Sequence, residues 1–173
     1  MPLTRPTRRK LVAAIAAFAA QAALGGWVST NYAVLACREF PLGNGQWWPE
    51  MDFAYGFTVL RALGRSGHGD VLPVVALVAA LVAIHMVHRW FAVFVVLAMA
   101  CLVRCLWREQ AAPAWRFAWL LLALLMAQLL SGLSNGVLGW PLVAALAHSA
   151  VAAALVLTVV LLSARGRSDA AAT

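Results

Sequence analysis

Long apolar stretches are the feature that most constrains how this chain folds. Several segments approach or exceed the roughly 20 apolar residues that a helix needs to cross a bilayer. Hydrophobic residues make up 64% of the 173-residue chain and charged residues only 11%, against about 45–50% and about 25% in soluble domains. This composition leaves too little polar surface for a soluble domain, and it excludes disorder. We therefore predict an all-α membrane protein, a bundle of transmembrane helices.

Four spans are expected from the positions of these stretches. The second is ambiguous, because its 37 residues would form a helix of about 55 Å, too long for one simple span and tight for two. It either forms one helix with an overhang or divides at His85–Arg89, which would give five spans. The first is expected to be a retained helix, since no small-residue cleavage site follows it. The four spans are Leu11–Ser29, Val71–Trp107, Phe117–Asn135 and Pro141–Ala164.

The distribution of charge favours four spans. With one long second helix, the basic flanks of all spans share one side of the membrane, which is the positive-inside pattern. The loop at 30–70 lies on the other side, with three arginines against four carboxylates. The net charge of +7 is thus explained by topology, and no nucleic-acid partner is expected. We expect a basic cytoplasmic terminus at 1–10, a single bundle at 11–164 and a cytoplasmic tail at 165–173.

The outer loop at 30–70 is rich in glycine and aromatic residues, which is typical of a segment at the membrane interface. A short amphipathic helix is expected at Met51–Leu63. Cys37 stands alone in this loop, whereas Cys101 and Cys105 fit small apolar side chains of the second span. These three cysteines supply neither a disulfide framework nor a structural metal site.

Three of the four histidines lie within the expected spans, where ionisable side chains are costly and usually functional. His88 precedes Arg104 by 16 residues, and His148 precedes Arg165 by 17 residues. Because spans two and four run in the same direction, the two imidazoles are expected at nearly the same depth, about 25 Å from the cytoplasmic ends.

Two histidines at matched depth suit the axial ligands of one haem held between helices. Arg89 would then pair with a haem propionate. The alternative is that His88 and His148 make ordinary interhelical hydrogen bonds. His85, one turn outward from His88, would contact the haem edge, relay protons or line the outer mouth. His68 falls in the glycine-rich loop and is expected to be solvated.

A short internal repeat links the first and third spans. Gln21 is followed four residues later by Gly25, and Gln128 by Gly132, and each motif precedes a span that carries histidine. The repeat predicts two related helical hairpins with a site where they meet. The glutamines and Asn135 are expected to make helix–helix hydrogen bonds, and the glycines to allow close approach of a helix or a cofactor.

Three runs of sequence together resemble haem A synthase. They are QAALGGWVSTNYAVLACREFPLGNGQWWPEMDF, AIHMVHR and SNGVLGWPLVAALAHSAVAA. That family oxidises a methyl group of haem O to the formyl group of haem A for cytochrome oxidase assembly. The similarity runs from about Lys10 to Ser163 and is to the carboxy-terminal four-helix half of the usual eight-span enzyme.

The resemblance implies a ligand set. The carboxy-terminal half of the family holds haem b through two histidines, which correspond here to His88, followed by Arg89, and to His148. The amino-terminal half carries the substrate haem and a glutamate three residues before its own histidine–arginine pair. That position is His85 here, so the residue associated with catalysis is absent from this chain.

The resemblance also implies a location and a departure from the family pattern. The protein is expected in a bacterial-type inner (plasma) membrane. The outer loop of the family often carries two cysteines six residues apart. Cys37 matches the first, but the second position is Gly43, so no disulfide is expected within the chain.

Three functions remain open. The first is the haem-b-binding half of a haem A synthase, active with a second four-helix half that is either another copy or a separate amino-terminal-half protein. The second is a small bis-histidine membrane cytochrome b without synthase activity. The third is a structural membrane protein with incidental histidines. A glutamate-bearing partner half would distinguish the first from the second.

Overall fold

The computed structural model describes residues 3–37, 39–59 and 74–168. Within these ranges every regular element is a helix. In chain order the elements are α1 (Arg5–Thr30), the 3₁₀ turn η1 (Ala33–Ala36), α2 (Phe53–Gly56), α3 (Val74–Arg108), α4 (Ala112–Val137) and α5 (Leu142–Ser168).

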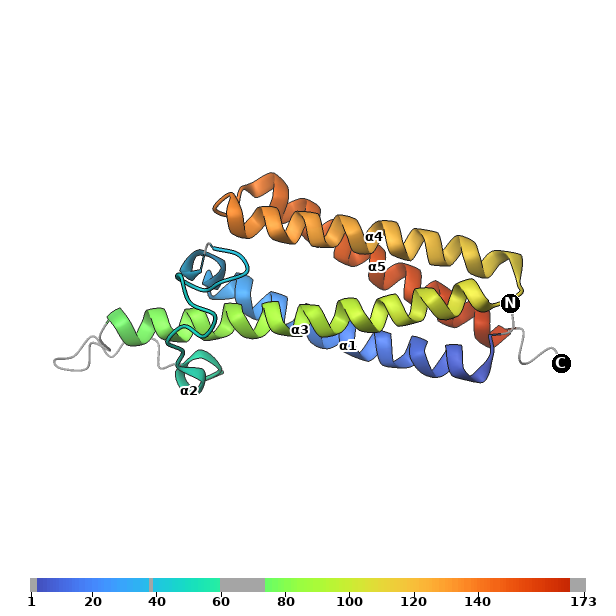
Figure 1. Cartoon of the computed structure of the whole chain (residues 1–173), viewed down its shortest axis with the longest axis horizontal. Helices are drawn as coiled ribbons and strands as arrows, with labels where there is room; N and C mark the ends of the chain where they lie inside the picture. Colours follow the sequence, from blue (N-terminus) through green and yellow to red (C-terminus); the bar gives the residue numbers. More distant parts are fainter. Residues whose placement is uncertain (1–2, 38, 60–73, 169–173) are drawn as a thin grey trace.

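The four long helices form an up-and-down bundle (Figure 1). Helices α1 and α3 lie side by side, α4 packs against α5, and both described ends of the chain lie at the same end of the bundle. Each of the four is long and apolar enough to cross a membrane, which confirms the predicted four-span integral membrane protein. Helix α3 continues without a break through His85–Arg89, so the five-span alternative is wrong.

The helix boundaries differ from the prediction at two places. Helix α1 begins six residues before the predicted span, because Pro6 is tolerated in the first turn, where its missing N–H has no helical partner to lose. The helix predicted at Met51–Leu63 is only the four-residue α2. Its cap is Asp52, whose side chain accepts a hydrogen bond from the Tyr55 N–H. Residues 60–63 of that prediction lie outside the described ranges.

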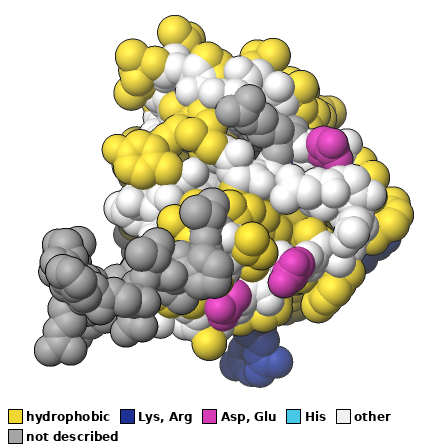
Figure 2. Space-filling model, turned by 90° about the vertical axis from the view of Figure 1, so that its left-hand side faces the viewer, with side chains coloured by type: hydrophobic (Ala, Val, Ile, Leu, Met, Phe, Trp, Pro, Cys, Tyr) yellow, Lys and Arg dark blue, Asp and Glu magenta, His cyan; other side chains and the backbone are white. Residues whose placement is uncertain are grey.

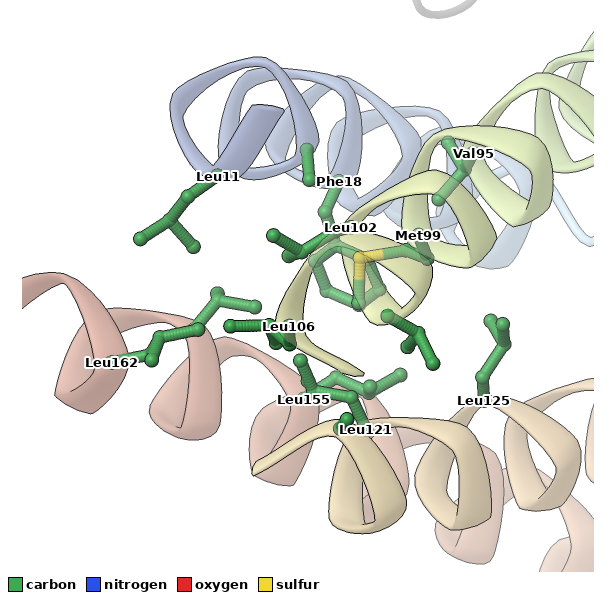
Figure 3. Close-up of a cluster of buried hydrophobic side chains, with 14 of the residues drawn as sticks. Leu11, Phe18, Val95, Met99, Leu102, Leu106, Leu121, Leu125, Leu155 and Leu162 are labelled. Carbon is green, nitrogen blue, oxygen red and sulfur yellow. The ribbon is translucent and has the colours of Figure 1, made fainter. Parts of the chain in front are cut away.

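Figure 3 shows the core shared by all four helices, and the helix segments that form it lie at the end of the bundle that carries the chain termini. Among the described residues this core stops at Phe18 in α1 and at Leu125 in α4. In each helix a glutamine follows three residues after that last core residue: Gln21 in α1 and Gln128 in α4. The largest core side chains that point toward one another are Leu11, Phe18, Val95, Met99, Leu102, Leu106, Leu121, Leu125, Leu155 and Leu162.

The opposite end of α3 is wrapped by the outer loop. Buried residues occupy every face of this helix between Ala79 and Met86, whereas a helix at a surface buries one stripe. The loop is fixed there by the Trp27 indole, which donates to the Gly56 carbonyl at 3.0 Å. Figure 2 looks onto this end and shows acidic side chains among exposed apolar ones, with no described histidine at the surface. The loop therefore covers α3 from Ala79 to Met86, whereas Val75, Leu77 and Val78 at the start of the helix stay exposed.

Glu109, just after α3, holds the start of the chain. Its Oε1 accepts hydrogen bonds from the Thr4 N–H at 3.3 Å, from the Thr4 hydroxyl at 2.6 Å and from the Thr7 hydroxyl. Partial burial raises the pKa of Glu109, but these hydrogen bonds outweigh burial and hold the pKa below its ordinary value of 4.5. The connection between α3 and α4 is thereby tied to the first turn of α1.

Because the folded pKa is depressed, the carboxylate contributes stability above pH 4.5 that is lost as the pH falls through the folded pKa. The group is largely solvated, so we expect a contribution of about 0–1 kcal/mol. Glu109→Gln should lower thermal stability slightly at pH 7 and match wild type at the lowest pH. The exposed Glu50→Gln is the control. An equal difference from wild type at both pH values would contradict the prediction.

Candidate functional site

His88 projects from α3 toward α1. The Gln21 amide nitrogen lies 3.1 Å from the ring Nδ1 and 3.3 Å from Nε2, and it donates to the His88 carbonyl at 3.2 Å. A Cβ added to Gly25 would lie 3.3 Å from Cε1 of the ring. The glycine therefore provides the space that the imidazole uses.

His148 is held in the same way within the second hairpin. The Gln128 amide nitrogen lies 3.1 Å from Nε2, and the Ser131 hydroxyl lies 3.1 Å from Nδ1. A Cβ added to Gly132 would lie 3.0 Å from Cε1, at the limit of what real contacts allow. Both ring nitrogens are thus bound by α4 although the histidine belongs to α5.

The sequence repeat is therefore a structural repeat. In each hairpin a glutamine binds the histidine of the following long helix, and a glycine one turn later faces the Cε1 edge of the ring. The predicted helix–helix hydrogen bonds of Gln21 and Gln128 are confirmed. Each hairpin thus contributes one preoriented imidazole to the same bundle.

Arg89 fastens the outer loop to α3. Its Nη1 donates to the carbonyls of Glu39 at 2.7 Å and Leu42 at 3.1 Å, and its Nη2 donates to the carbonyl of Cys37 at 2.7 Å. Its Nε donates to Nε2 of the buried His85 at 3.2 Å. An arginine has five N–H donors, and the contacts to described residues leave one N–H of Nη2 for a further acceptor.

Cys37 is fully buried, beside Gly43. A Cβ added to Gly43 would lie 3.0 Å from the Cys37 Sγ. In a disulfide the Cβ of one residue and the sulfur of the other are about 3 Å apart, from the bond lengths involved. In the family resemblance, residues 37 and 43 correspond to a pair of cysteines. The loop brings these two positions together, although residue 43 is glycine here.

Gly43→Cys is expected to form a disulfide with Cys37 after a small movement of Pro49 and Met86, whose side chains also approach the added Cβ. Closing so short a loop should stabilise the protein by roughly 2 kcal/mol. Alkylation of the oxidised, denatured variant should modify only Cys101 and Cys105. Gln46→Cys, at an exposed loop position, serves as the control. Modification of all four cysteines before reduction would contradict the prediction.

Four buried polar atoms in the described part of the chain lack a hydrogen-bond partner. They are Gln21 Oε1, Gln128 Oε1, His85 Nδ1 and Asn135 Oδ1. Buried polar atoms are rarely left unpaired in a native protein without a missing water, ion or ligand. The bond predicted for Asn135 is not made by its side-chain oxygen.

The side chains available as metal ligands indicate which kind of cofactor the site could hold. Within the described ranges no three His, Cys, Asp or Glu side chains gather in a way that could hold a metal ion. A zinc site needs three or four protein ligands, whereas a porphyrin supplies the equatorial ligands of haem iron and leaves two axial positions to the protein. Two neutral imidazoles therefore fit haem.

Sequence reasoning missed two features of this site. It did not identify Ser131 as a partner of His148, although its place one turn after Gln128 was a usable signal. It also missed the binding of Arg89 to loop carbonyls. The remaining histidine, His68, lies outside the described ranges.

The fold and the site define a four-span helical membrane protein with one oriented imidazole in each of two related hairpins. The family described as cytochrome oxidase assembly protein, COX15-CtaA, matches residues 1–160. The heme A synthase of Shewanella oneidensis is 32% identical over 140 residues, which are 81% of this chain and 41% of that protein. The chain therefore belongs to the COX15-CtaA family. It spans about two fifths of the length of this relative, and no solved structure matches it.

Proposed function

We propose that the chain is the haem-b-binding half of a haem A synthase-like oxidoreductase that converts haem O to haem A for cytochrome oxidase assembly. The observation that carries this proposal is the pair of imidazoles, each fixed by a glutamine and a glycine of its own hairpin. His88 and His148 would be the axial ligands of haem iron. Bound haem would supply one-electron chemistry at the iron.

The residues around this pair have distinct roles in the proposal. The apolar core below the site, which includes Val95 and Leu125, would keep water from the iron ligands. Arg89 would pair with a haem propionate through its remaining Nη2 N–H, while its other donors keep the loop closed over this end. His85 would support Arg89, because its Nε2 accepts from the guanidinium.

The proposed enzyme also requires a second four-helix half. The chain covers only 41% of the similar heme A synthase, and it lacks the glutamate that the family places three residues before the histidine–arginine pair. The oxidation would therefore occur in a partner half, either a second copy of this chain or a separate amino-terminal-half protein. We place the complex in a bacterial inner membrane with both termini cytoplasmic, as the basic flanks favour.

A small bis-histidine cytochrome b that only transfers electrons is the second candidate. It uses the same ligand pair and requires no partner half. Copurification of a homologue that carries the glutamate would favour the synthase, whereas a haem-loaded protein that purifies alone and has no effect on haem A levels would favour the cytochrome.

The test is the absorption spectrum of the detergent-purified protein, oxidised and reduced. Wild type should show a low-spin b-type spectrum, and His88→Ala and His148→Ala should each lose it or convert it to high spin, because each removes one axial ligand. Thr158→Val, on the same helix as His148, removes a buried hydroxyl that bonds within that helix, so it is the matched control and should remain low-spin. A colourless wild type from haem-replete cells would overturn the proposal.

A further inference from the structure

We propose that Gln21 and Gln128 are positioning residues that orient the two axial imidazoles and hold the proton of each ring once iron is bound. This inference rests on the proposed haem ligation by His88 and His148. It concerns the two amides, which neither the family match nor the similar synthase assigns.

The first argument is the repetition of the arrangement. The two glutamines occupy equivalent places in the two hairpins, three residues after the last core residue of α1 and of α4. Each amide nitrogen lies 3.1 Å from a ring nitrogen of the histidine in the following long helix. The same side chain at the same place in both hairpins, on the same target, indicates a common task.

The second argument is the unpaired oxygen of each amide. Gln21 Oε1 and Gln128 Oε1 are buried and have no hydrogen-bond partner within the described residues. A buried amide with one unsatisfied end is costly, and an apolar side chain would avoid that cost. Stability alone therefore does not explain glutamine at either position.

Iron binding gives the unpaired oxygens a partner. A neutral imidazole that binds iron through one nitrogen carries its proton on the other, which then donates a hydrogen bond. In each amide the oxygen and nitrogen exchange places by rotation of the terminal group. Rotation would turn Oε1 of Gln21 or Gln128 toward the ring, where it accepts that proton. No covalent bond is broken in this step. Gln21 gives up the hydrogen bond that its amide nitrogen donates to the His88 carbonyl, and in each pair the ring N–H becomes the donor to the amide oxygen.

The two sites differ in one respect that the experiment can use. His148 is also held by the Ser131 hydroxyl at Nδ1, whereas in the described ranges Gln21 is the side chain seen bound to the His88 ring. Removal of Gln21 should therefore disturb the orientation of the His88 ring more than removal of Gln128 disturbs that of His148.

The experiment measures haem loss from purified, haem-loaded protein to an excess of apo-globin, with the electron paramagnetic resonance spectrum of the ferric haem as a second readout. Loss of an outer partner of a ligand typically weakens metal retention by about 10–100-fold. We expect Gln21→Leu to lose haem about 10–100-fold faster, with low-spin signals that are shifted but present, and Gln128→Leu to be affected less. Gln21→Glu keeps an acceptor oxygen and should restore retention.

Thr158→Val is the matched control, since it removes a buried hydroxyl that bonds within its own helix and should behave as wild type. Haem-loaded wild type with Gln21→Leu unchanged in both readouts would overturn this inference and leave the proposed ligation intact. Wild type without haem would overturn the proposed function itself. If Gln21→Leu does not fold, unchanged retention and spectrum in Gln128→Leu would overturn the inference.

Discussion

If His88 and His148 bind haem as we propose, Gly132→Val is expected to remove the bis-histidine state of that haem. An added Cβ already lies 3.0 Å from Cε1 and 3.4 Å from Nδ1 of His148, and valine brings two further methyl groups. The ring must leave its position between Gln128 and Ser131. Overpacking of this kind costs about 1–3 kcal/mol, which corresponds to roughly a 10–100-fold loss of the six-coordinate form. The fraction of low-spin haem in the absorption spectrum measures this.

Gly26→Val is the matched control. Gly26, next to Gly25, is also a helical glycine, but nothing lies within 4 Å of its added Cβ. Both variants place a β-branched residue in a helix, so the general cost to helix stability is the same. If the two variants bind haem equally, the ring of His148 does not need the space at Gly132, and the prediction is wrong.

Arg89→Met is expected to release the outer loop from α3. The substitution keeps an apolar stem but leaves the carbonyls of Cys37, Glu39 and Leu42 without this donor, at about 1–3 kcal/mol for each that stays buried. Because each 1.4 kcal/mol is a factor of ten, the buried Cys37 thiol should react with a maleimide at least about tenfold faster. The measurement uses a background in which Cys101 and Cys105 are replaced by alanine.

Arg104→Met tests whether the effect is specific. Arg104 is exposed and lies on the same helix, four residues before its other end, so its replacement should leave the labelling rate of Cys37 unchanged. Equal labelling rates in wild type and Arg89→Met would show that the loop is held by its apolar contacts with Met86 and Val82 rather than by the arginine.

The sequence predicted the parts of this structure that follow from hydropathy and charge. The four spans, the unbroken second span and the helix–helix hydrogen bonding of the two glutamines follow from these patterns, whereas the histidine partners of the glutamines come from the structure. The helix at Met51–Leu63 was overestimated, because an apolar periodicity does not reveal that Gly56 ends a single turn. The ligand pair His88 and His148 stays a prediction from matched depth and family resemblance.

The attachment of Arg89 could not be predicted for a different reason. Its acceptors are backbone carbonyls, which every residue possesses, so no side-chain pattern marks Cys37, Glu39 or Leu42 as its partners. The proximity of Gly43 to Cys37 likewise depends on the path of the loop. The family resemblance pointed to these two positions but could not show that the loop places them side by side.

The division of the site between hairpins has a consequence for biogenesis. The partners that hold His88 come from α1, and those that hold His148 come from α4. All the described partners of His88 are therefore present once residues 1–108 have been synthesised, before α4 and α5 exist. If the two histidines bind haem as we propose, the site would be complete only after the last hairpin has been translated.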